Sequence, residues 1–264
     1  MKKIKDLIGR YITGRNIFLF SSYRPNSAGT YKMRDEATIF NIKTMPIVLS
    51  SIANYFQQIK IKTVNDFPIE KEKVEKFKNV FNKYGSDKAS GHGYESIYAF
   101  VLNDLPSEIN LLEIGLGTNY EDVISTMGKK GKPGASLYAF SELLPKSNIY
   151  GADVDTRILF NEENIKTCYL DQREYSSYKD LFSSFGKIKF DLIIDDGLHI
   201  QSANLNTLLF ALDSLNDGGY LIVEDIPEFA LETWYLVNRI IEKKFKMEII
   251  KGNISYLVTL KKQK

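Results

Sequence analysis

The sequence predicts an α/β protein: a doubly wound, mostly parallel sheet with an antiparallel C-terminal strand, preceded by an N-terminal extension. Three observations support this prediction. From residue 71 onward, short apolar runs alternate with segments of helical spacing, as in βαβ units. The first apolar run leads into a glycine-rich turn at residues 115–117. Residues 245–262 form two apolar stretches around Gly252-Asn253, which predicts a hairpin at the end of the chain.

Residues 1–75 differ from the rest of the chain because they show no alternation of strands and helices. Residues 21–37 are polar and rich in turn formers, and residues 47–61 have the spacing of an amphipathic helix. We therefore divide the chain into an N-terminal extension, 1–75, and a second domain, 76–264. The extension is interpreted as an oligomer contact or a lid, or equally as a packing appendage, and a homo-oligomer is expected.

The second domain can be divided into elements by its apolar runs and its helix-ending residues. A helix over residues 72–84 is predicted to end at Gly85, and a second helix over residues 94–104 ends before Pro106. Strands are then predicted over residues 109–114, 148–153, 165–170, 190–194 and 220–223, and helices over residues 135–144, 175–185, 202–215 and 231–243.

Composition excludes several classes of protein. A formal net charge of +2 provides no strong basic field, so nucleic acid is not an expected partner. The single cysteine, Cys168, excludes an internal disulfide and fits a reducing cytosol; its apolar neighbours predict a buried, structural thiol. No apolar run reaches the roughly 18 residues that a membrane span needs. Arg10 and Arg15 interrupt the pattern of a signal peptide, so a cytoplasmic location is expected.

Two of the predicted strands end in a pair of acids. Asp195-Asp196 follows one strand, with His199 three residues beyond, and Glu224-Asp225 follows the next. Neighbouring parallel strands bring their C-terminal ends to one edge of a sheet, so these side chains are expected to converge. Because like charges repel, a bound cation is the natural reason to tolerate them. An oxygen-rich cluster suits Mg²⁺, Mn²⁺ or Ca²⁺ better than Zn²⁺.

The glycine turn predicts a nucleotide-type cofactor. In residues 111–117, LLEIGLG, the glycines allow the backbone to pass close to a ligand, although a tight turn alone would also use them. The third glycine and immediate helix that a dinucleotide site favours are missing. Glu113, placed before the glycines, favours a cofactor with an amino group and a sulfonium, which is S-adenosylmethionine. Asp153 suits a ribose diol, and Asp171-Gln172 suits an adenine edge.

Six motifs occur along the chain in one order. They are KYGSDKASGHGY (83–94), LLEIGLG (111–117), GASLYAF with IYGADVD (134–155), DQ (171–172), IIDDGLH (193–199) and GGYLIVED (218–225). With these motifs, residues 80–260 resemble the class I S-adenosylmethionine-dependent methyltransferases, which have a Rossmann-like fold. The resemblance is greatest to the metal-dependent macrolide-sugar O-methyltransferases of the mycinamicin type and their relatives in surface-polysaccharide clusters.

The resemblance implies a role for each residue that matches a motif. The metal ligands, for Mg²⁺ or Mn²⁺, would be Asp196, Glu224 and Asp225. The catalytic residues would be His199, as the base, and Asp196. Asp195 would support the cofactor or orient the metal shell, or would only cap a helix. The implied cofactor contacts are Glu113, Gly115, Gly117, Asp153, Asp171 and Gln172, with Ser86, Lys88, His92 and Tyr94 over the methionine end.

The expected function is therefore a metal-dependent O-methyltransferase. Its acceptor is expected to be a small molecule or a sugar nucleotide, with a sugar or a sugar-linked group, such as a capsular phosphoramidate, as the target in surface-polysaccharide synthesis. Residues 118–132 are expected to contact this acceptor. Alternatives are the tailoring of a small glycosylated natural product, an NAD-dependent sugar dehydrogenase, and an inactive scaffold that binds S-adenosylmethionine. The missing glycine argues against the dehydrogenase, and His199 with the acid pairs argues against the scaffold.

Overall fold

The computed structural model describes residues 48, 51–52 and 59–264. Most of the helix predicted over residues 47–61 lies outside the described residues. Ile59–Lys264 forms one compact unit, so residues 59–75, which we assigned to the extension, belong to the same unit as the predicted domain. The role of the extension stays a prediction. None of the helices in the described part of the chain combines the length and apolarity that a bilayer crossing demands.

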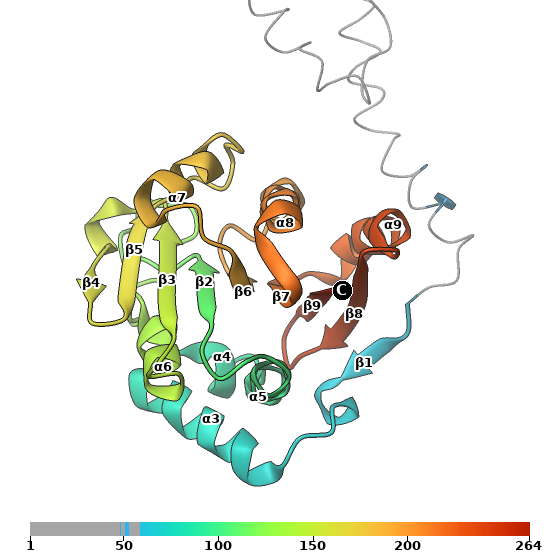
Figure 1. The fold of residues 1–264 in the computed structure, drawn as a ribbon, viewed down its shortest axis with the longest axis horizontal. Coiled ribbons are helices and arrows are strands. Elements are labelled where there is room, and N and C mark those ends of the chain that lie inside the picture. The colour runs from blue at the N-terminus through green and yellow to red at the C-terminus, as the bar shows by residue number, and fades with distance from the viewer. Residues whose placement is uncertain (1–47, 49–50, 53–58) are drawn as a thin grey trace, which may run out of the picture. The chain divides into compact units, whose positions relative to one another are not determined.

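A nine-stranded sheet forms the centre of the described unit (Figure 1). Its strand order is β1-β8-β9-β7-β6-β2-β3-β5-β4. The central strands from β5 to β7 pair in parallel, and β9 pairs antiparallel with both β7 and β8. The predicted fold class is therefore confirmed. The strands are β1 (Ile61–Thr63), β2 (Asn110–Ile114), β3 (Asn148–Asp153), β4 (Asn161–Glu162), β5 (Ile165–Tyr169), β6 (Phe190–Asp195), β7 (Leu215–Ile226), β8 (Phe245–Lys251) and β9 (Tyr256–Lys262).

Helices cover both faces of this sheet, which explains why the central strands are largely apolar (Figure 1). Because side chains alternate along a strand, Leu112 and Ile193 pack toward α7, α8 and α9, while Leu111 and Leu192 pack toward the opposite face. The helices on that opposite face are α3 (Lys71–Tyr84), α4 (Asp87–Ser90), α5 (Glu95–Asp104) and α6 (Ala135–Leu143); those on the first are α7 (Ser177–Phe185), α8 (Gln201–Ser214) and α9 (Leu231–Ile241).

Most predicted elements are present with small shifts at their ends, although β7 begins five residues earlier than predicted, and three short strands and α-helices are additional. The predicted end of α3 is confirmed, because Gly85 adopts the left-handed conformation (φ 80°) that closes a helix. The sequence did not predict β1, β4 or α4. Each has four residues or fewer, and β1 and β4 have no buried residue, so neither carries an apolar run. They form through contacts with neighbours, as when β1 pairs in parallel with β8.

The position of the functional site follows from the connections around β2 and β6, which are neighbours at the centre of the sheet. From β2 the chain continues outward to β3 and β5, whereas from β6 it continues to β7 on the other side. Connections that leave in opposite directions open a crevice at the C-terminal ends of the two strands. All the predicted acid pairs and the glycine turn lie at this edge.

Candidate functional site

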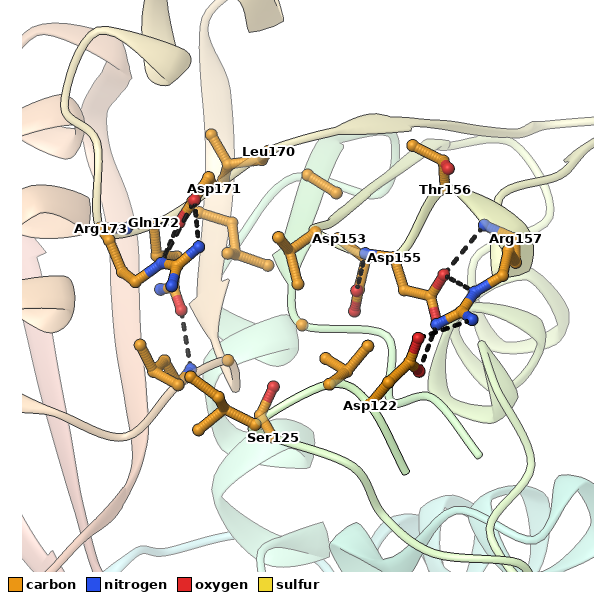
Figure 2. A pocket seen from close by; sticks show the side chains of 18 residues that line it. Asp122, Ser125, Asp153, Asp155, Thr156, Arg157, Leu170, Asp171, Gln172 and Arg173 are labelled. Carbon is orange, nitrogen blue, oxygen red and sulfur yellow. Dashed lines mark hydrogen bonds and ion pairs between the residues drawn. The ribbon is translucent and has the colours of Figure 1, made fainter. Parts of the chain in front are cut away.

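Two cavities open at the C-terminal edge of the parallel strands. The first has a volume of about 390 Å³ and is lined by the ends of β2, β3 and β5 and by residues 122–125 (Figure 2). The second has a volume of about 480 Å³ and lies against α4, residues 125–132 and Asp196. Gly115, Asp153 and Gly197 line both cavities, so the two spaces adjoin.

The glycine turn is held tightly between neighbouring strands. Gly115 has a φ of 91°, and a Cβ atom there would lie 2.1 Å from the carbonyl oxygen of Asp196. Only glycine fits this contact. The carboxylate of Asp153 supports the same turn, because it accepts hydrogen bonds from the backbone N–H groups of Leu116 (2.7 Å) and Asp155 (2.8 Å). Burial raises the pKa of Asp153 although these bonds act against it.

Asp171 and Gln172 lie together in the first cavity (Figure 2). The Arg173 guanidinium bonds both carboxylate oxygens of Asp171, with Nη2 2.7 Å from Oδ2, and lowers the pKa of that carboxyl. The amide of Gln172 donates to Asp195 (2.7 Å) and accepts from the backbone N–H of Leu198 (2.8 Å). Gln172 therefore joins the ends of β5 and β6 and fixes the shape of this wall.

Alternation along the strands decides which carboxylates meet. Glu113 lies on the α6 side of β2, where it accepts a hydrogen bond from Ser136 (2.6 Å). Asp195 is fully buried on the opposite face, where Asn204 of α8 donates to it (3.2 Å). The next residue, Asp196, returns to the first side. Asp195 therefore contacts α8 and Gln172 instead of the other acids.

A bulge in β7 places two neighbouring acids at one site. Val223 pairs with Val258 and Ile226 with Tyr256, so Glu224 and Asp225 stand opposite a single residue of β9. Asp225 has a φ of 54°, which is unusual for a residue with a side chain. Regular alternation would send the two carboxylates to opposite faces, whereas the bulge brings both close to Asp196.

Asp196, His199 and Asp225 form the outer part of the acid cluster, along the second cavity. Their potential ligand atoms all lie within 4.8 Å of one another. His199 also has a positive φ, of 53°, and strain of this kind, about 1–3 kcal/mol, is concentrated at functional sites. The two carboxylates, beside a polar cavity, fit a hexacoordinate divalent cation such as Mg²⁺ or Mn²⁺, and the imidazole of His199 lies next to them.

Glu224 lies behind this outer cluster and is 2% exposed. One of its oxygens accepts from Lys88 Nζ (2.9 Å) and the other from the Tyr98 hydroxyl. The same ammonium contacts Asp196 (2.6 Å) and Glu113 (3.1 Å). Burial acts to lower the pKa of Lys88, but the three carboxylates outweigh it and raise that pKa well above the usual value. Glu224 would bind a cation only through an oxygen shared with Lys88 or Tyr98.

The segment of residues 86–94 contacts the acid cluster and does not line the first cavity. His92 Nδ1 lies 2.9 Å from Asp225 Oδ1, and Tyr94 donates its hydroxyl hydrogen bond to the same oxygen at 2.9 Å. Pairing with Asp225, and next with Asp87, raises the pKa of His92 to about 10. Burial acts to raise the pKa of Asp225, but bonds from His92 and Ser255 hold it below its usual value.

The structure brings most of the predicted site residues to the two cavities. Those that line a cavity are Ser86, Lys88, Gly115, Gly117, Asp153, Asp171, Gln172, Asp196, His199 and Asp225. Those that support the walls from behind are Glu113, His92, Tyr94, Asp195 and Glu224.

Sequence reasoning missed Tyr98, which holds Glu224, and Arg157, which fastens the loop over the first cavity. The Arg157 guanidinium bonds Asp155 (2.7 Å) and Asp122 (2.8 Å) (Figure 2). It also lies 3.8 Å from the ring centre of Tyr120. The available signal for Arg157 was an aspartate two residues before it, Asp155, directly after a predicted strand. Tyr98 sits in an apolar helix, where it is indistinguishable from a core residue.

Comparisons with known proteins agree with this geometry, although no family model matches the chain. The chain is 29% identical over 145 residues to the 8-demethyl-8-alpha-L-rhamnosyl tetracenomycin-C 2'-O-methyltransferase of Streptomyces olivaceus, covering 54% of this chain and 36% of the relative. It is 30% identical over 122 residues to the mycinamicin VI 2''-O-methyltransferase of Micromonospora griseorubida, covering 45% and 27%. The matches therefore span about a third of the length of these relatives.

Among solved structures, the mycinamicin-pathway methyltransferase MycE, in complex with Mg, SAH and mycinamycin VI, superposes with a TM-score of 0.57. The match has 19% identity and covers 72% of this chain and 55% of MycE. These findings confirm the resemblance that the six motifs indicated. In sequence and in fold, the chain is similar to the class I S-adenosylmethionine-dependent methyltransferases and, within them, to the sugar O-methyltransferases of the mycinamicin type.

Proposed function

We propose that this protein is an S-adenosylmethionine-dependent O-methyltransferase that acts on a sugar hydroxyl of a glycosylated acceptor. The observation that carries the proposal is the common wall of the two cavities, formed by Gly115, Ser125, Asp153 and Gly197. Because the cavities share this wall, a cofactor can extend from the first cavity to the edge of the Asp196–His199–Asp225 cluster. A surface-polysaccharide sugar stays a prediction, because the acceptors named for the relatives are glycosylated natural products.

The residues present fit the two groups that the proposal requires. S-adenosylmethionine supplies an electrophilic methyl group, and a divalent cation lowers the pKa of a hydroxyl bound to it. Asp153, Asp171 and Gln172 would surround the adenosine end in the first cavity. Asp196 and Asp225 would hold the cation beside the second cavity.

His199 is proposed to accept the proton of the acceptor hydroxyl. Its Nε2 lies 3.9 Å from Asp196 Oδ1, and its side chain is 35% exposed toward the second cavity, so an acceptor can reach it. Proton transfer to a positioned imidazole leaves the acceptor oxygen as the nucleophile, and the proton ends on the histidine ring. The walls formed by α4 and residues 125–132 position the acceptor, and alignment of this kind supplies much of the rate gain.

The experiment is a methyl-transfer assay with purified protein, S-adenosylmethionine, Mg²⁺ and three acceptor classes: sugar nucleotides, glycosylated small molecules and oligosaccharides. We expect S-adenosylhomocysteine and a product heavier by one methyl group with at least one glycosylated acceptor. Activity should disappear in EDTA and return with added metal, and Asp196→Ala and Asp225→Ala should abolish it, whereas Asp213→Ala, an exposed acid on α8, should not. Calorimetry that detects NAD binding but no S-adenosylhomocysteine binding would overturn the proposal.

A further inference from the structure

A lysine lies at the centre of the acid cluster, where a sequence motif had placed a cofactor contact. Lys88 belongs to the four-residue helix α4 and is 1% exposed. Its ammonium contacts one carboxylate at the end of each of three neighbouring strands: Glu113 of β2, Asp196 after β6 and Glu224 of β7. Lys88 donates hydrogen bonds to Asp196 and Glu224, whereas its contact with Glu113 at 3.1 Å is an ion pair.

Burial makes this arrangement energetically necessary. Glu113 is 0% exposed and Glu224 is 2% exposed, and a buried carboxylate without a partner costs several kcal/mol. Besides Lys88, hydroxyl groups are the partners that the structure shows for these two side chains: Ser136 for Glu113 and Tyr98 for Glu224. Among the described residues of the cluster, Lys88 is therefore the cation that neutralises Glu113 and Glu224, which form its inner half.

The outer half has a different partner. Asp225 pairs with His92, and Asp196 contacts Lys88 and is itself a member of the candidate cation cluster. Lys88 therefore sits next to the space where a divalent cation would bind, with Asp196 between them. A positive charge in that position orients Asp196 and at the same time repels an incoming cation.

We propose that Lys88 is a positioning residue: its buried ammonium holds Glu224 and Asp196 in place before a divalent cation binds, and its charge limits how tightly that cation binds. This inference rests on the metal site of the proposed function. Segment 86–94, implied by resemblance to cover the cofactor, then serves mainly to organise the acid cluster, through Lys88, His92 and Tyr94.

The test compares wild type with Lys88→Met, which keeps the length of the side chain and removes its charge. Mn²⁺ affinity is measured by electron paramagnetic resonance, and thermal unfolding is followed with and without Mg²⁺. We expect Lys88→Met to unfold at a lower temperature without metal, to bind Mn²⁺ at least about fivefold more tightly, and to gain more stability from Mg²⁺ than wild type does. Unchanged or weaker Mn²⁺ binding would overturn the claim that the charge of Lys88 limits cation affinity, because neither a packing role nor ligand positioning makes its removal increase that affinity.

A second variant keeps the test decisive if Lys88→Met does not fold. The double variant Lys88→Met/Glu224→Gln removes one buried cation and one buried anion together, so it should recover part of the lost melting temperature, while Glu113 and Asp196 still lack the ammonium. If the double variant is no more stable than Lys88→Met, the proposed charge pairing is wrong. The matched control is Lys83→Met. Lys83 pairs with Glu142, and its side chain is 59% exposed, so neither the melting temperature nor the Mn²⁺ affinity should change.

A cofactor titration separates this inference from the proposed function. If Lys88 positions the acids, Lys88→Met should change the affinity for S-adenosylhomocysteine by less than about threefold. A loss of affinity much larger than that would return Lys88 to the role of a cofactor contact and contradict the inference. Wild type that binds Mn²⁺ but no S-adenosylhomocysteine would contradict the proposed methyltransferase while leaving the charge arrangement supported.

Discussion

His199 and Asp225 are held in a backbone conformation that side chains rarely adopt, with φ angles of 53° and 54°. Asp225 lies in the bulge of β7 and His199 follows β6, and both belong to the same cluster. Such strain persists only where surrounding structure enforces it, and it is concentrated where side chains must be aimed. The orientation of these two side chains is therefore set by the loop that follows β6 and by the bulge within β7.

His199 separates an active enzyme from a cofactor-binding scaffold. We expect His199→Ala to lower turnover by about 10²- to 10⁴-fold, the usual contribution of a general base, because no other imidazole lines the cavities in the described residues. Affinity for S-adenosylhomocysteine should be nearly unchanged. The measurement is single-turnover methyl transfer beside a separate cofactor titration. Near-normal turnover would show that His199 does not take the proton.

Cys168 is expected to be unreactive in the folded protein. The thiol lies on β5 in the core, and burial raises its pKa to about 11, so little of the reactive thiolate exists at pH 8. Labelling with a thiol-specific disulfide reagent at pH 8 should be slow for the native protein and complete within minutes after unfolding. Rapid labelling of the native protein would mean that this part of the sheet opens readily.

At the scale of elements, the bulge in β7 and the loop fastened by Arg157 shape the two cavities. The bulge directs Glu224 and Asp225 toward one edge, as the shift in pairing with β9 shows. Arg157 links Asp155 at the end of β3 to Asp122 in the loop over the first cavity. The bulge and the Arg157 contacts each join a regular element to an irregular segment at the place where a ligand would bind.

The Asp155–Arg157 contact predicts a pH dependence of stability. Bonds from Arg157 lower the pKa of Asp155 from 3.8 to about 2, so the carboxylate is favoured in the folded state. A lowered folded pKa contributes stability above the unfolded value, and this contribution is lost as the pH falls through about 2. Asp155→Asn should therefore be less stable than wild type at pH 7 and pH 5, and the difference should shrink below about pH 4.

Urea denaturation of wild type and Asp155→Asn, from pH 7 down to the lowest pH at which both remain folded, measures this difference. Asp213→Asn serves as the control, because it replaces an exposed acid on α8 and should leave stability unchanged over the whole range. A constant difference between wild type and Asp155→Asn down to pH 3 would contradict an ionic origin for the contact.

At the scale of the whole molecule, the crevice at the centre of the sheet couples ligand binding to the stability of the compact unit. Saturation with S-adenosylhomocysteine at about 100 times its dissociation constant should raise the free energy of unfolding by about 2.7 kcal/mol. For a unit of this size, that corresponds to a melting temperature higher by about 5–10 °C. NAD should cause no shift, since the turn lacks the third glycine. Scanning calorimetry with each ligand tests this, and stabilisation by NAD alone would refute the assignment.

Local pattern determined the order of elements and the location of the site. The alternation of apolar runs and helical spacing predicted the parallel strands from β2 to β7, and Gly85 marked the end of α3. Convergence of Asp196, His199 and Asp225 was also predictable, since neighbouring parallel strands end at one edge. These inferences hold because periodicity, caps and strand direction depend on residues close together in the sequence.

Only the tertiary structure decided which acids of the cluster pair with Lys88 and which face the candidate cation site. The contacts of Lys88 with Glu113 and Glu224 join residues 25 and 136 positions apart in the sequence, and no local pattern records them. The bulge that aims Asp225 depends on its pairing with β9, and β1 forms only because β8 offers a free edge. Long-range packing selects these features, because a buried charge takes its partner from whichever segment the fold brings alongside it.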